Sequence, residues 1–112
     1  MILHFCPERD WAAAQRDGLY TAASLASEGF IHCSTVELVH VAANRHAHGQ
    51  RDLVLLEVDE ARLAEPPRFE PGDPTDPASA LYPHVYGPIP VAAVVGVREW
   101  RPGPDGSFAP LA

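Results

Sequence analysis

Hydrophobic and polar positions along the chain follow two periods, and together they predict a mixed α+β domain. Apolar segments with aliphatic, aromatic or β-branched residues are typical of strands, and they cover residues 2–5, 29–33, 53–58 and 91–100. Shorter strand-like patterns cover 68–70 and 82–86. Because strands outnumber helices and the helices come early, this order favours an α+β fold over alternating β–α–β units.

Two segments have apolar residues at helical spacing. Residues 8–16 form the first, and Gly18 follows as the stop signal. Residues 36–48 form the second, with Ser34 or Thr35 available as the helix cap. The sequence therefore predicts two main helices beside a β-sheet core, with single helical turns at 24–28 and 59–63.

Proline and glycine divide the second half of the chain. Residues 71–79 hold three prolines, a glycine and two aspartates, which excludes regular structure there. Loops of this length in a compact domain are usually functional or mobile. Residues 102–112 are again rich in proline and glycine. We therefore expect one α+β domain over residues 1–101 and a flexible tail over 102–112.

Length and composition agree with a single globular domain. The chain has 112 residues, of which 46% are hydrophobic and 21% charged. A domain of this size buries about 65% of the surface that its unfolded chain exposes. This composition excludes disorder over most of the length.

The net charge of the chain and the length of its apolar runs limit the kinds of partner that it can bind. Eight basic against fifteen acidic residues give a net charge of −7, which repels phosphate backbones and disfavours nucleic acid. The longest apolar runs, such as 90–95, are far shorter than the ~20 residues that a membrane span requires. The first residues have no basic region before an apolar stretch, as a secretory signal would. Two cysteines are too few for a disulfide scaffold. We expect a cytoplasmic protein that binds no membrane.

Three of the six histidines lie inside strand-like segments: His4, His32 and His84. A buried imidazole without partners costs free energy, so each either forms hydrogen bonds in the core or faces a polar cleft. Their occurrence on three separate segments favours one shared cleft. Three histidines and a water would also make a catalytic zinc site, so a metal-dependent hydrolase is an alternative, although no metal is expected.

Three other polar residues are candidates for the same cleft. Ser34 is either a helix cap or a ligand-binding hydroxyl. Asn44 lies in mid-helix despite its modest propensity, which indicates a side-chain partner. Glu70 precedes the proline-rich loop and is either an exposed charge or a carboxylate that faces the cleft.

Three stretches taken together resemble a known family. These are GFIHCST at 29–35, DLVLL at 52–56 and PHVYGPI at 83–89. Over about residues 2–98 the chain resembles the small bacterial family catalogued as domain of unknown function 952. By fold, that family is placed with the ADP-ribosyltransferases and the RNA 2′-phosphotransferases.

This resemblance implies a split β-sheet that holds NAD in a cleft. His4 then matches the histidine that bonds the adenosine ribose, and His32 the residue that stacks on nicotinamide. Ser34 and Asn44 match the serine and asparagine that follow in the poly-ADP-ribosylating enzymes. These four residues are the predicted nucleotide-binding set, with NAD as substrate and no metal.

One position departs from the family pattern. His84 stands where such enzymes often have a glutamate that polarises the nicotinamide ribose, and Glu70 is the candidate to supply the missing carboxylate. His84 and Glu70 are therefore the predicted catalytic residues of an ADP-ribosyl transfer from NAD to an acceptor. The alternatives are an inactive nucleotide-binding module and the metal-dependent hydrolase.

Overall fold

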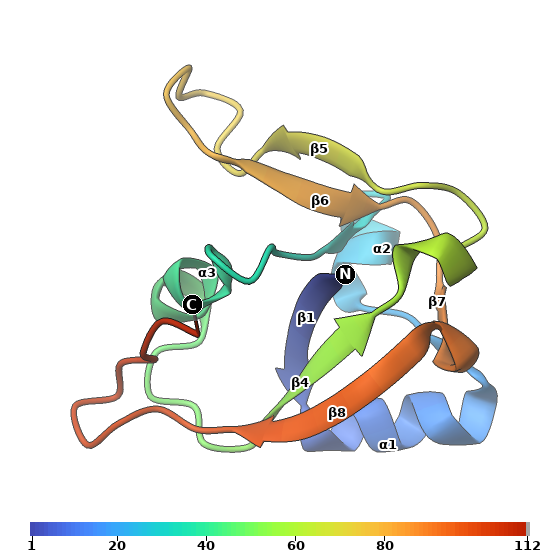
Figure 1. Cartoon of the computed structure of the whole chain (residues 1–112), viewed down its shortest axis with the longest axis horizontal. Coiled ribbons are helices and arrows are strands. Elements are labelled where there is room, and N and C mark those ends of the chain that lie inside the picture. Colours follow the sequence, from blue (N-terminus) through green and yellow to red (C-terminus); the bar gives the residue numbers. More distant parts are fainter. Residues whose placement is uncertain (112) are drawn as a thin grey trace.

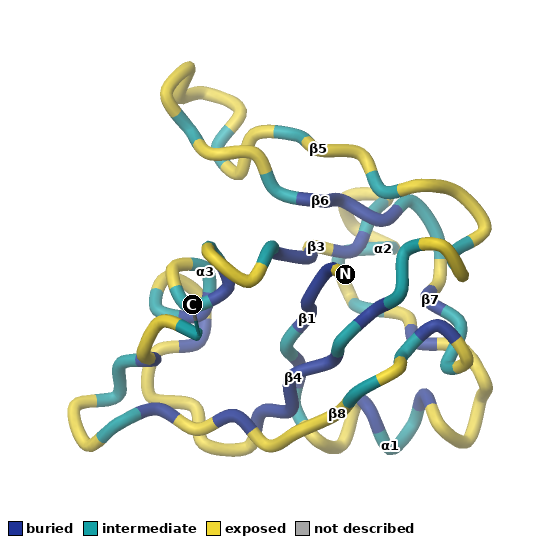
Figure 2. Tube along the Cα trace, viewed as in Figure 1, coloured by how far each residue is buried: buried dark blue, intermediate teal, exposed yellow. Residues whose placement is uncertain are grey.

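The first β-sheet forms the centre of the molecule and is antiparallel. In the computed structural model, which describes residues 1–111, its order is β1 (Ile2–Pro7), β4 (Leu53–Val58) and β8 (Val94–Trp100). β4 is the central strand, as its apolar run predicts, and both of its faces are largely buried (Figure 2). Residues 91–93 were expected in the last strand, but they form a 3₁₀ turn, η2 (Val91–Ala93). The strand starts at Val94, opposite Val58 where β4 ends, so residues 91–93 have no β4 residue beside them.

The second sheet has the order β3 (Ile31–His32), β6 (Leu81–Val85) and β5 (Arg68–Pro71), and lies above the first in Figure 1. β3 is shorter than expected because the chain leaves β6 and crosses to the first sheet. Leu3 and Ser34 exchange two backbone hydrogen bonds, of 2.8 and 2.7 Å, just after β3. A small third sheet pairs β2 (Leu19–Tyr20) with β7 (Ile89–Pro90). The expected split, antiparallel sheet of an α+β domain is confirmed.

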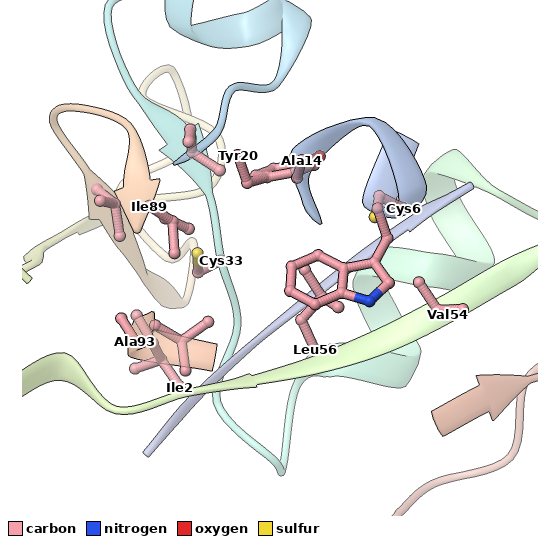
Figure 3. Close-up of a cluster of buried hydrophobic side chains, with 13 residues drawn as sticks. Ile2, Cys6, Ala14, Tyr20, Cys33, Val54, Leu56, Ile89 and Ala93 are labelled. Carbon is pink, nitrogen blue, oxygen red and sulfur yellow. The ribbon is translucent and has the colours of Figure 1, made fainter. Parts of the chain in front are cut away.

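Helices cover the two faces of the first sheet. α1 (Glu8–Asp17) confirms the predicted first helix, and Gly18 ends it in the left-handed conformation with φ of 80°. Its residues Trp11 and Ala14 pack in the core cluster of Figure 3, with side chains from all three sheets. The short helix α2 (Ala23–Ser27) and the 3₁₀ turn η1 (Glu60–Arg62) correspond to the two predicted single turns.

α3 (Val39–His46) packs on the opposite face of the first sheet and begins three residues later than predicted. The carbonyl of Thr35 accepts the N–H groups of Leu38 and Val39, so residues 35–38 form a turn before the helix. Ser34 pairs with Leu3 instead of capping the helix, and in the described chain the cap position is Leu38, which makes no side-chain cap bond. The cap assigned to Ser34 or Thr35 is therefore corrected.

The segment after Trp100 packs against α3. Phe108 is 2% exposed, and its ring lies 4.6 Å from that of Trp100. The Asn44 side chain donates to the carbonyl of Phe108 and accepts from its N–H, at 3.0 and 2.7 Å. Proline and glycine content predicted a flexible tail here, but burial of Phe108 attaches this segment to the domain core. Within residues 1–111, no helix is long and apolar enough to cross a membrane.

Candidate functional site

A cavity of about 480 Å³ is lined by residues of the two larger sheets and α3. Its lining comes from β1, β3, α3 and β6, together with residues that follow α2, β3 and β5. The residues that line it are His4, Phe5, Glu28, His32, Cys33, Ser34, Ala42, Arg45, His46, Gly72, Tyr82 and His84. Its volume lies within the range of about 300–1,000 Å³ that small-molecule sites occupy.

The structure brings the three strand histidines to this cavity. His32 and His84 are paired across β3 and β6, with their ring centroids 5.2 Å apart. The Nδ1 atom of His4, on β1, lies 2.6 Å from the carbonyl oxygen of His32. The three imidazoles nevertheless have different partners, and these partners determine what each ring can do.

His4 has hydrogen-bond partners at both ring nitrogens. A carbonyl oxygen only accepts, so Nδ1–H donates to His32, and Nε2 then accepts from the Tyr20 hydroxyl at 2.8 Å. Burial lowers the pKa of His4 to about 4. His4 is therefore neutral at pH 7, and in this geometry it fixes β3 rather than offering a free nitrogen to a ligand.

His84 is 4% exposed and has a partner at one nitrogen. Its Nδ1 lies 2.9 Å from Oε1 of Glu70, while its Nε2 has no hydrogen-bond partner within residues 1–111. The Phe30 ring is stacked on the imidazole, with centroids 4.1 Å apart and planes 18° apart. The side chain is thus held on one face by an aromatic ring and at one nitrogen by a carboxylate.

Glu70 acts on His84 rather than on the cavity. It accepts from the Tyr86 hydroxyl at 2.6 Å as well as from His84, and it is not among the described residues that line the cavity. The hydrogen bonds from Tyr86 and His84 lower the pKa of the Glu70 carboxyl. The sequence left two interpretations of Glu70, an exposed charge and a carboxylate that faces the cleft. Neither one describes its position beside His84 and Tyr86.

His32 is the accessible imidazole of the three. Its side chain is 51% exposed, and its Nε2 lies 2.9 Å from Oε2 of Glu28. Ser34, beside it along the chain, is 4% exposed and also lines the cavity. Arg45 and His46, from the last turn of α3, add a guanidinium and a fourth imidazole to the lining.

Comparisons with known proteins identify the family. The model of a protein family of unknown function, DUF952, matches residues 5–97. The chain belongs to this family. The match includes His32, Ser34, Glu70 and His84, and it begins one residue after His4. No curated protein matches the chain.

Three solved structures similar to this chain are of the protein CC0527 of Caulobacter crescentus. Its crystal structure is 29% identical, with a TM-score of 0.84, and covers 96% of this chain and 92% of that one. A crystal structure of a double mutant gives 28% identity and a TM-score of 0.83 over the same shares of the two chains. The solution NMR structure gives 30% identity and a TM-score of 0.80, over 96% and 90%.

In this DUF952 protein, one expected site residue lies outside the cavity lining, and the geometry does not support the alternative of a zinc site. Asn44 does not belong to the described lining, because its amide is bonded to Phe108. The three histidines do not converge as zinc ligands either, since His4 uses both nitrogens internally. Among the described residues, no group of three or more histidine, cysteine or acidic side chains is placed to hold a metal ion.

Several site residues were missed by the sequence interpretation. Phe30 lies in the motif stretch 29–35 and Tyr86 in the stretch 83–89. Tyr86 is two residues from His84, and this spacing places both side chains on one face of a strand. That period-two spacing was the signal available for Tyr86. Tyr20, Arg45 and the lining role of His46 had no comparable local signal.

Proposed function

We propose that the cavity binds NAD or ADP-ribose, and that the protein transfers ADP-ribose from NAD to an acceptor. The observation that carries this proposal is the convergence of His4, His32 and His84, from three strands, on one cavity between the parts of a split sheet. The family resemblance implied such a cleft from the sequence. Imidazole nitrogens are suited to the hydroxyls of a ribose, since they donate or accept hydrogen bonds.

The polar groups of the lining support a ligand with phosphate groups. The whole chain carries −7, yet the cavity lining has one guanidinium, Arg45, for its single carboxylate, Glu28, and it adds four imidazole rings as hydrogen-bonding groups. A guanidinium is well suited to phosphate oxygens because it can bind two of them at once. Arg45 and His46 are the residues that we assign to a pyrophosphate.

We assign the remaining roles from the cavity lining and from the hydrogen-bond partners of each residue. His32 and Ser34 contact the nucleotide directly, and His84 meets the reacting ribose with Glu70 behind it. His4 contributes by holding the carbonyl of His32, and Asn44 by holding Phe108 behind α3. The proposal therefore keeps His4 and Asn44 as positioning residues for the nucleotide site.

One observation favours a second function, nucleotide binding without transfer. Glu70 is the carboxylate that the family resemblance would place against the nicotinamide ribose, and its hydrogen bonds go to His84 and Tyr86. A protein with this geometry would bind the nucleotide and leave it intact.

Two measurements test both functions. Because a ligand that binds the native state stabilises it, NAD and ADP-ribose should raise the melting temperature at millimolar concentration. Arg45→Gln should weaken binding, so that about ten times more nucleotide is needed for the same rise in melting temperature. Arg16→Gln, at the end of α1, should leave this concentration dependence unchanged. Nicotinamide released from NAD then separates transfer from binding alone. If neither nucleotide shifts the melting temperature, both functions are rejected.

A further inference from the structure

We infer that His84 is a preset hydrogen-bond acceptor and general base for a hydroxyl group, and that Glu70, Tyr86 and Arg68 are positioning residues that act through it. The inference rests on the proposed function for the identity of the ligand. It adds the chemical class of the group that His84 meets, and hence of the acceptor that is modified: an alcohol or water.

The tautomer of His84 follows from its partner. A carboxylate accepts only, so the contact of 2.9 Å between Nδ1 and Glu70 places the proton on Nδ1. In the neutral ring, Nε2 then carries a lone pair and accepts. This nitrogen is buried and has no partner within the described chain, and leaving a buried polar atom unpaired costs free energy. In a cavity-lining residue, such an atom is satisfied by a ligand that donates a hydrogen bond.

The surroundings keep Glu70 ionised and in place. Tyr86 donates to the carboxylate oxygen that His84 also contacts. Arg68 pairs with His84 across β5 and β6, and its guanidinium carbon lies 4.3 Å from the centre of the Tyr86 ring. An arginine over an aromatic face is attracted to it, so this contact holds Tyr86 beside Glu70.

Packing restricts the imidazole to one orientation. Phe30 is stacked on it, while the His32 ring meets it at 80° from the neighbouring strand. A base that is held in advance loses little freedom when a ligand arrives, which is the condition for efficient proton transfer. By comparison, His32 is half exposed, and its ring is bonded to Glu28 and meets Phe30 and His84 only edge-on.

The chemical step balances with an oxygen nucleophile. His84 Nε2 takes the proton of the acceptor hydroxyl, and the oxygen forms a bond to C1′ of the nicotinamide ribose. The bond between C1′ and nicotinamide breaks, and its electron pair leaves with the neutral nicotinamide. Glu70 stabilises the imidazolium of His84 until the proton on Nε2 passes to water. A carboxylate acceptor would have no proton to give, so this geometry favours an alcohol or water.

The test is nitrogen-detected NMR of the histidines in the full chain at pH 7. We expect His84 to carry its proton on Nδ1 and to show an unprotonated Nε2. Glu70→Ala should move the ring toward the Nε2–H form that free histidine favours, and Tyr86→Phe should move it partly. Glu28→Ala, which removes the carboxylate beside His32, is the matched control and should leave the proton of His84 on Nδ1.

ADP-ribose added to the same sample separates the two proposals. Binding should shift the Nε2 signal of His84, because a ribose hydroxyl donates to it. Binding that leaves this signal unmoved, or a proton found on Nε2 in the free protein, would overturn the role of His84. If no signal moves anywhere, the nucleotide-binding proposal fails, and the tautomer still decides whether His84 is a preset base.

Discussion

At the scale of single residues, partners rather than position in a strand determine what each histidine does. His4 donates and accepts within the core, His32 faces Glu28 at the surface, and His84 is bonded at one nitrogen only. All three follow the same sequence signal, a histidine in an apolar segment. The signal identified a cluster correctly but did not distinguish a core residue from a ligand contact.

His4 should make stability depend on pH. Its pKa is 6.5 when unfolded and about 4 when folded, so the unfolded chain binds a proton that the folded chain does not. The free energy of unfolding is therefore highest above pH 6.5, and it should fall by about 3 kcal/mol as the pH drops from 6.5 to 4. Denaturant unfolding measured across this range should show a flatter profile for His4→Gln. Equal slopes for the two proteins would contradict the neutral, buried His4.

Alanine variants of His32 and His84 should separate effects on ligand binding from effects on the free energy of unfolding. His32→Ala alters a half-exposed side chain and should change the free energy of unfolding by less than about 0.5 kcal/mol. His84→Ala removes a buried, stacked ring and should cost about 2 kcal/mol. Both should weaken ADP-ribose binding tenfold or more, as measured by calorimetry on the folded fraction. Unchanged affinity in both variants would mean that the pair is only a packing contact.

At the scale of elements, short or irregular segments build the site. β3 has two residues, yet it pairs with β6 and is followed at once by the bridge to β1. Residues 101–111 have no helix or strand, yet they support α3 through the contact of Phe108 with Asn44. α3 in turn carries Arg45 and His46, so this support connects the segment around Phe108 with the cavity wall.

Phe108→Ala should therefore destabilise the whole domain. Loss of a buried phenylalanine typically costs about 3–5 kcal/mol, because it leaves a cavity in a packed core. Urea unfolding should show a loss of this size, whereas Val97→Ala, at a position 44% exposed on β8, should cost less than about 1 kcal/mol. A small effect of Phe108→Ala would restore the expectation of an independent, flexible tail.

At the scale of the whole molecule, the split sheet creates the cavity. The first sheet is covered by α1 on one face and α3 on the other, and the bridge between Leu3 and Ser34, just after β3, joins it to the second sheet. The cavity is lined by α3 and by strands of both sheets, β1, β3 and β6. Neither sheet alone contains all the residues of the site.

This arrangement predicts a fold that does not depend on metal. Each strand histidine has a protein partner, and the described residues offer no metal-binding group. The melting temperature should be unchanged by a chelator, and elemental analysis of untagged protein should find less than about a tenth of an equivalent of zinc, iron or manganese. A stoichiometric metal, or a loss of stability with chelator, would instead support the hydrolase alternative.

The sequence by itself determined the features that arise from neighbouring residues. The apolar run at 53–58 predicted the central strand, and Gly18 the end of the first helix. Prolines and aspartates predicted the loop after Glu70. These features depend on side-chain periodicity and on backbone restrictions, which act over a few residues and so can be recognised without the fold.

Tertiary structure alone decided which distant groups meet. Asn44 and Phe108 are 64 positions apart, and His84 and Glu70 are 14 apart across a hairpin. The start of α3 depended on Ser34 pairing with Leu3, and the state of His4 on burial beside Tyr20. Such pairings depend on strand register and packing, and these arise only once the chain has folded. The sequence therefore supplied the candidate histidines, and the fold determined which of them has a ring nitrogen without a hydrogen-bond partner among the described residues.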